Sequence, residues 1–144
     1  MASILVVDDE RAIRNSLKDI LEFESYTVLL AENGNIGLEI LQNNKIDLIF
    51  SDIKMPEMDG VEFLKKAIEI RGDIPIIMIS GHATIDIAVD AIKFGAFDFI
   101  AKPLDLNRIL ITVKNALEKN VLVQETTKLR KKISSKYEMI GDSA

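Results

Sequence analysis

Apolar residues recur along the chain in short runs that have the length of β-strands. Between these runs the apolar positions return with the period of a helix, so strand and helix patterns alternate up to about residue 118. Because the strand runs are continuously apolar, both faces of the sheet must be covered. The pattern predicts an α/β fold, a doubly wound five-stranded parallel sheet with helices on both faces. The expected strands are Ile4–Val7, Thr27–Ala31, Leu48–Phe50, Ile76–Ile79 and Phe97–Ala101.

The helix expected after the fourth strand carries two apolar sets. One set has helical period and is expected to face the sheet; it consists of Ile85, Ala88, Val89 and Ile92. The other set lies off that stripe and is expected to form an exposed output surface; it consists of Ile87, Ala91 and Phe94. The last helix has an apolar stripe from Leu106 to Leu117 and a suitable N-cap in Asp105.

Polar side chains follow the expected strands. They are Asp8 and Asp9 after the first strand, Asp52 after the third, Ser80 after the fourth and Lys102 after the fifth. Doubly wound sheets bind ligands beyond the carboxyl ends of their strands, so these side chains are expected to meet. Converging carboxylates repel one another unless a cation or a lysine neutralises them, and their oxygens suit Mg²⁺. Such a pocket is equipped for phosphoryl transfer, with the central carboxylate as nucleophile.

Composition narrows the possible sites and partners. The chain of 144 residues has no cysteine and one histidine, so any metal must be held by oxygen. The net charge is -5, and residues 1–117 are acidic, which argues against direct nucleic-acid contact by this part. Residues 118–137 are basic, but this short segment alone is weak evidence for such contact. No run of eighteen apolar residues and no signal-peptide pattern is found, so we expect a cytoplasmic protein without membrane contact.

Four segments at these strand ends resemble motifs of the response-regulator receiver family. They are ILVVDDE at 4–10, SDIKMPEMDG at 51–60, ISGHA at 79–83 and FDFIAKPL at 97–104. Each motif is weak alone, but four in the correct order are specific. The resemblance covers residues 3 to about 118 and implies a flavodoxin-like receiver fold, phosphorylated by a sensor histidine kinase.

The resemblance also implies a role for individual residues. Asp52 would be the phospho-acceptor, Asp8 and Asp9 would hold Mg²⁺, and the backbone carbonyl of Lys54 would be a further ligand. Lys102 would meet the phosphoryl oxygens.

Two further positions match the switch residues of the family. Ser80 occupies the hydroxyl-switch position and Phe99 the aromatic-switch position. In similar proteins the peptide bond before Pro103 is cis.

Three other functions compete with this interpretation. A Mg²⁺-dependent phosphohydrolase of the haloacid-dehalogenase type needs a second aspartate two residues after its nucleophile, where this chain has Lys54. A flavin or nucleotide module would need phosphate donors after the first strand, where this chain has the acidic residues 8–10. A degenerate receiver used only for dimerisation is disfavoured by the intact polar set. We therefore expect a phospho-acceptor rather than an enzyme.

The chain beyond the receiver, which we place at 1–118, is expected to connect it to missing domains. Residues 119–137 predict a helical linker that helps two copies pair, on the basis of a short heptad-like spacing. Residues 138–144 resemble the opening of an AAA+ ATPase domain. The segment 81–105 resembles receivers of the nitrogen-regulation type, which implies sigma-54-dependent transcription through that ATPase and a DNA-binding domain.

Overall fold

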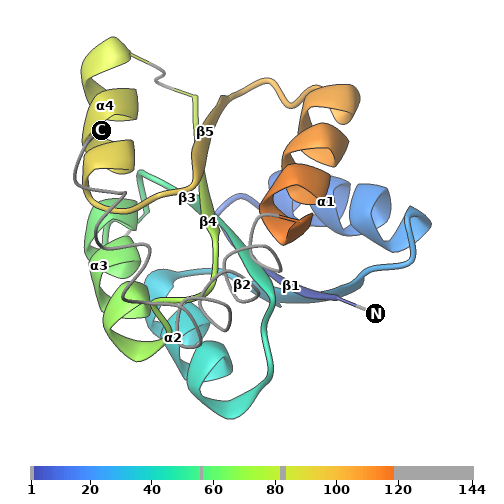
Figure 1. Ribbon diagram of the computed structural model, residues 1–144, viewed down its shortest axis with the longest axis horizontal. Helices are drawn as coiled ribbons and strands as arrows, with labels where there is room; N and C mark the ends of the chain where they lie inside the picture. Colours follow the sequence, from blue (N-terminus) through green and yellow to red (C-terminus); the bar gives the residue numbers. More distant parts are fainter. Residues whose placement is uncertain (1, 56, 82–83, 119–144) are drawn as a thin grey trace, which may run out of the picture.

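The computed structural model describes residues 2–55, 57–81 and 84–118. Strands and helices alternate along them (Figure 1). The elements are β1 (Ser3–Val7), α1 (Arg11–Phe23), β2 (Thr27–Ala31), α2 (Gly34–Asn43), β3 (Leu48–Asp52), α3 (Gly60–Ile70), β4 (Ile76–Ser80), α4 (Ile85–Lys93) and β5 (Asp98–Ala101). A further helix, here the C-terminal helix, begins at residue 106 and reaches the end of the described part at 118. The linker expected at 119–137 and the segment 138–144 lie outside the described residues.

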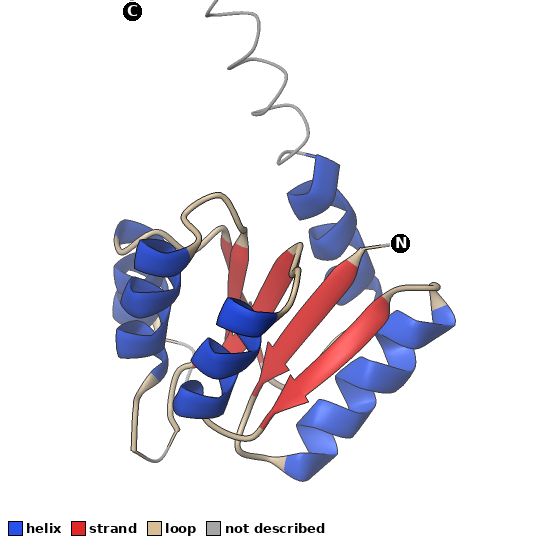
Figure 2. Cartoon of the chain, turned by 90° about the horizontal axis from the view of Figure 1, so that it is seen from below, coloured by secondary structure: helices blue, strands red, loops and turns tan. Residues whose placement is uncertain are grey.

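The five strands form one sheet in the order β2-β1-β3-β4-β5, and every neighbouring pair is parallel. The helices lie in two layers, α1 and the C-terminal helix on one face and α2, α3 and α4 on the other (Figures 1 and 2). The doubly wound α/β fold predicted from the sequence is confirmed. The strand order reverses between β1 and β3, where sheets of this type bind their ligands.

The continuous apolar strands are explained by two separate cores. Leu5 and Val7 of β1 pack into the core beneath α2, α3 and α4. Ile4 and Val6 of the same strand pack into the core beneath α1 and the C-terminal helix. Successive side chains of a strand point to opposite faces, so a strand covered on both sides is apolar at every position.

Strand ends deviate from the sequence prediction by one or two residues. Asp52 and Ser80 are the last residues of β3 and β4 rather than the first residues after them. Both still take part in the sheet, since Asp52 is in register with Ile79 and Ser80 with Ala101. The backbones of Asp52 and Ser80 are thus fixed by the sheet itself.

The predicted orientation of α4 is wrong. Ile85 and Val89, which were expected to face the sheet, are 83% and 55% exposed, whereas Ala91 is 1% exposed. The helix packs on the sheet through Ile87 and Ala91 instead. The reason is size: α4 approaches the sheet closely where its inner face carries the small Ala91, and the larger branched residues remain outside.

The expected output surface on α4 therefore needs the same correction. Ala91 is buried and Ile87 is partly buried in the core, so these two residues cannot form an exposed patch. Phe94 is 39% exposed, and its ring lies 4.2 Å from the Lys65 ammonium of α3. The outer apolar face of α4 consists of Ile85, Val89 and Ile92.

Candidate functional site

The loop after β1 holds Asp8 in a fixed position. Asp8 is fully buried, and its backbone N–H donates to the carbonyl of Ala31 at the end of β2 over 3.1 Å. Its carboxylate oxygen Oδ1 accepts a hydrogen bond of 2.8 Å from the backbone N–H of Glu10. The Arg14 guanidinium of α1 donates to the carbonyl oxygen of Asp8 over 2.7 Å. Strand, loop and helix together therefore orient this carboxylate.

Asp52 is held by the end of β3 and by the start of α3. Its residue exposure is 5%, and its Oδ1 accepts a hydrogen bond of 2.9 Å from the N–H of Ile53. The N–H of Gly60 donates to the carbonyl of Ile53 over 2.6 Å, which brings α3 against the strand end. A Cβ at position 60 would collide with the backbone carbonyl oxygen of Asp52. Only glycine permits this approach.

Lys102 reaches the carboxylates from the end of β5. Its backbone N–H donates to the carbonyl of Ser80 over 2.8 Å, and the following peptide bond to Pro103 is cis, as expected. Its Nζ lies 3.2 Å from Asp8 Oδ2 and 3.5 Å from Asp52 Oδ2. Three strand ends thus bring a cation and two buried carboxylates together, as the sequence predicted.

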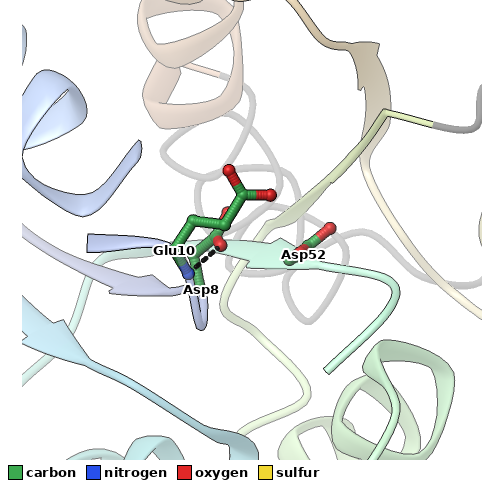
Figure 3. Close-up of side chains that lie close together, drawn as sticks. All are labelled: Asp8, Glu10 and Asp52. Carbon is green, nitrogen blue, oxygen red and sulfur yellow. Dashed lines mark hydrogen bonds between the residues drawn. The ribbon is translucent and has the colours of Figure 1, made fainter. Parts of the chain in front are cut away.

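A third carboxylate joins this group. Figure 3 shows Glu10 beside Asp8 and facing Asp52, and carboxylate oxygens of the three residues lie within 4.8 Å of one another. Glu10 Oε1 also lies 3.4 Å from Lys102 Nζ. Glu10 was not predicted from the sequence, although it stands two residues after Asp8 with extended dihedral angles (φ -87°, ψ 116°). Because alternate residues of extended backbone point to the same side, the spacing of two residues from Asp8 could have identified Glu10 as part of the group.

The group fits a divalent cation. Asp8 Oδ2 is buried and lacks a regular hydrogen-bond partner among the described residues, although it lies 3.2 Å from the Lys102 ammonium. Three carboxylates and one ammonium leave two negative charges for a cation to balance. Oxygen ligands of this type suit Mg²⁺. Asp9, an expected ligand, is exposed and lies outside the three-carboxylate group.

The electrostatics of the site follow from burial and from these neighbours. Burial raises the pKa of Asp52 to about 6, assisted by the Asp8 charge and opposed by Lys102. Burial likewise raises the pKa of Asp8, against the Glu10 N–H and Lys102. For Lys102, burial lowers the pKa, but the charges of Asp8 and Asp52 outweigh it and the pKa lies above the usual value. At neutral pH the Asp52 carboxylate is therefore mostly ionised and lies beside the positive charge of Lys102.

The expected switch residues lie on the neighbouring strands β4 and β5. Ser80 ends β4 with 2% exposure, one strand away from Asp52. Phe99 of β5 is half-buried, and its carbonyl accepts a hydrogen bond of 3.2 Å from Arg108. Phe99 also lines a groove of about 470 Å³ between α4, β5 and the C-terminal helix. The Lys54 side chain is exposed, and the role of its backbone carbonyl as a metal ligand stays a prediction.

Comparison with known proteins places this arrangement in a family. The family model of the response regulator receiver domain matches residues 4–114, which include all of the carboxylates and Lys102. The chain belongs to the response regulator receiver family. Among the helices of the described residues, the receiver contains none that is long and apolar enough to cross a membrane.

Curated relatives show which receivers this one is similar to. A putative NtrX-like response regulator of Rickettsia bellii is 38% identical over 99% of this chain, which covers 30% of that relative. The C4-dicarboxylate transport transcriptional regulatory protein DctD of Rhizobium meliloti is 36% identical over 90% of this chain and 28% of its own length. The receiver thus spans about 30% of the length of such relatives.

Solved structures agree with the fold and with the resemblance to nitrogen-regulation receivers. NtrX of Brucella abortus is 37% identical with a TM-score of 0.87, over 90% of this chain and 30% of that chain. The beryllofluoride-activated receiver dimer of NtrC4 is 39% identical with a TM-score of 0.80, over 83% of this chain and 99% of that chain. These matches confirm the expected receiver fold and favour neither the phosphohydrolase nor the flavin module.

Proposed function

We propose that this receiver is phosphorylated on Asp52 by a sensor histidine kinase in the cytoplasm, in a Mg²⁺-dependent reaction. The observation that supports this best is the position of the nearly buried Asp52 carboxylate. It ends β3 at the reversal of strand order, beside Asp8 and 3.5 Å from the Lys102 ammonium. Positioning and charge stabilisation are most of what phosphoryl transfer requires.

The reaction forms a bond between an Asp52 carboxylate oxygen and phosphorus. The bond from phosphorus to the kinase histidine nitrogen breaks, and its electron pair remains on the imidazole, which takes up a proton. Lys102 pairs with the phosphoryl oxygens as charge develops on them. When bound, Mg²⁺ supplies further positive charge to those oxygens. Its ligands would be Asp8, Asp9, Asp52 and the backbone carbonyl of Lys54.

The phosphoryl group stays on the receiver, which makes it a phospho-acceptor rather than an enzyme with an external substrate. The position two residues after Asp52 is Lys54, so the acid/base aspartate of the phosphohydrolase alternative is missing from that place. Loss of the phosphoryl group then depends on water reaching the aspartyl phosphate.

Phosphorylation is transmitted through Ser80 to the α4 side of the receiver. The new phosphoryl oxygens accept a hydrogen bond from the Ser80 hydroxyl, which draws the end of β4 and the following loop inward. Phe99 then shifts in the groove that it lines with Ile85 and Ala88. The output surface is the outer face of α4, where Ile85, Val89 and Ile92 are exposed.

A second copy of the chain is the proposed partner of that surface. The C-terminal helix, which borders the same groove as α4, also exposes apolar side chains, since Leu106 and Ile111 are 51% and 59% exposed. Several exposed apolar residues on one face of a helix, such as those of α4, are typical of an interaction site. The similar NtrC4 receiver forms a dimer when activated by beryllofluoride.

The downstream function is regulation of transcription by the full-length protein. The relatives are about three times as long as this chain, and DctD is a transcriptional regulatory protein. We propose that residues 119–137 link the receiver to an AAA+ ATPase that begins near 138, followed by a DNA-binding domain, in a sigma-54-dependent activator. ATP hydrolysis and DNA contact belong to those domains.

Intact mass tests the central proposal. Acetyl phosphate with Mg²⁺ should add one phosphoryl group, with release of acetate, and Asp52→Asn or removal of the metal with EDTA should abolish the addition. Asp47→Asn is a matched control, because Asp47 precedes β3 and its carboxylate binds the N–H of Ser3 at the opposite end of the sheet. Labelling that survives both Asp52→Asn and EDTA would contradict the assignment.

A further inference from the structure

Lys102 is shared between carboxylates of very different exposure. Its Nζ lies 3.2 Å from Asp8, 3.4 Å from Glu10 and 3.5 Å from Asp52. The side chains of Asp8 and Asp52 are 0% and 7% exposed, whereas that of Glu10 is 59% exposed. The ammonium therefore lies at the boundary between a buried carboxylate pair and an accessible carboxylate.

The buried pair is also where the proposed function needs Mg²⁺. Magnesium binds carboxylate oxygens at about 2.0–2.1 Å. Lys102 Nζ already lies within 3.2 and 3.5 Å of one oxygen each of Asp8 and Asp52, so two cations would share this space and repel each other. The ammonium has to withdraw from these oxygens for the metal to bind.

Glu10 is the nearest other carboxylate to which the Lys102 ammonium can move. The backbone of Lys102 is anchored by its hydrogen bond to the Ser80 carbonyl, so the side chain alone can move. Glu10 Oε1 is already in contact with Nζ, and the Glu10 backbone is tied to the Asp8 carboxylate over 2.8 Å. After a small rotation of its side chain, Lys102 would pair with the exposed carboxylate of Glu10 instead of the buried carboxylates of Asp8 and Asp52.

We propose that Glu10 is a positioning residue that holds the Lys102 ammonium while Mg²⁺ occupies the site between Asp8 and Asp52. The inference rests on the proposed function and adds a role that the motif resemblance does not assign. Glu10 then favours metal binding through Lys102, without being a metal ligand itself.

The test is a double-mutant cycle on Mg²⁺ affinity, read from amide shifts of the receiver in a ¹⁵N NMR titration. Glu10→Gln should weaken Mg²⁺ binding about threefold, the effect expected from one partly exposed ion pair. Lys102→Met should tighten it, because the competing charge is removed. Combined with Lys102→Met, Glu10→Gln should lose most of its effect. The dispersion of each spectrum confirms that the variant is folded.

Glu32→Gln is the matched control, because Glu32 is an exposed carboxylate that follows β2 at the same edge of the sheet. It should leave the affinity almost unchanged. If Glu32→Gln and Glu10→Gln lose the same Mg²⁺ affinity, the effect is due to net charge alone and the inference is overturned. If Glu10→Gln weakens Mg²⁺ binding as much in the Lys102→Met background as in the wild type, Glu10 acts as a metal ligand and the inference is overturned. If Lys102→Met does not bind Mg²⁺ more tightly than the wild type, the ammonium does not compete with the metal, and the inference is overturned as well. Wild-type protein that binds no Mg²⁺ would refute the proposed function itself.

Discussion

Replacing Asp52 by asparagine should stabilise the receiver at neutral pH. The substitution keeps the size of the side chain and keeps an Oδ1 acceptor for the N–H of Ile53, which now donates over 2.9 Å. It removes a charge that is almost completely buried and that lies beside the charge of Asp8. Lys102 retains its ion pairs with Asp8 and Glu10 in the variant.

The size of the effect follows from the pKa of Asp52, which burial raises from 3.8 to about 6. Each pKa unit corresponds to about 1.4 kcal/mol, so the ionised carboxylate lowers the free energy of unfolding by about 3 kcal/mol at neutral pH. Relaxation of the site reduces this value, and a gain of about 1–3 kcal/mol is expected for Asp52→Asn. The pKa of about 6 for Asp52 already includes the attraction of Lys102, so this attraction needs no separate correction.

The sign of the pH dependence is fixed by the direction of this change. Between pH 3.8 and about 6 the folded state binds more protons at Asp52 than the unfolded state does, so stability falls as the pH rises through this window. Below it, the carboxyl is protonated in both states and the charge contributes nothing. The advantage of Asp52→Asn should therefore be small at pH 4.0 and complete at pH 7.5.

Urea unfolding followed by circular dichroism, in EDTA, measures the difference at both pH values. Asp73→Asn is a control of opposite sign, because a hydrogen bond from Arg71 lowers the pKa of the Asp73 carboxyl. That stabilisation is present above the normal pKa and is lost on acidification. Equal stability of wild type and Asp52→Asn at pH 7.5, or a gain that persists at pH 4.0, would refute the reasoning.

Three further changes test other parts of the structure. Gly60→Ala should lower the free energy of unfolding by about 1–3 kcal/mol and slow phosphorylation, because the added methyl group collides with the Asp52 carbonyl. Gly72→Ala is its control: the added methyl group would meet only Ile68, so the loss of stability in the same urea experiment should be smaller. Ser80→Ala should leave phosphorylation intact but abolish the amide shifts that it causes in α4; identical shifts in both proteins would exclude this route. Sedimentation of residues 1–118 and 1–144, each with and without phosphorylation, should show stronger association for the longer chain, and four equal monomers would reject pairing by the tail.

The sheet and the buried part of the pocket were predictable from the sequence, because they depend on local pattern and on one topological rule. Apolar runs of strand length place Asp8, Asp52 and Lys102 at strand ends, and parallel strands bring those ends together. The structure confirms this meeting through ion pairs of Lys102 with both carboxylates. The roles of these residues in phosphorylation stay predictions.

The face of α4 was not predictable in this way, because the helix has apolar residues on two sides. A period of 3.6 residues fits the stripe of Ile85, Val89 and Ile92 as well as that of Ile87 and Ala91. The choice depends on which side chains fit against the sheet, which is a property of packing and not of period. Glu10 was not predicted either, because its side chain is exposed and the receiver motif is defined by the two adjacent aspartates.

The misjudged helix and the overlooked glutamate have a common physical basis. A receiver that responds to phosphorylation needs groups that are not committed to the core, and such groups leave the weakest pattern in a sequence. The outer face of α4 remains apolar although it is exposed, and Glu10 remains exposed although it pairs with a nearly buried lysine. Buried residues fix the pocket, whereas accessible ones have room to change partners, as the proposed phosphorylation of Asp52 would require. Stability and response are therefore assigned to different residues of the same elements, and a substitution on the outer face of α4 should alter association much more than folding.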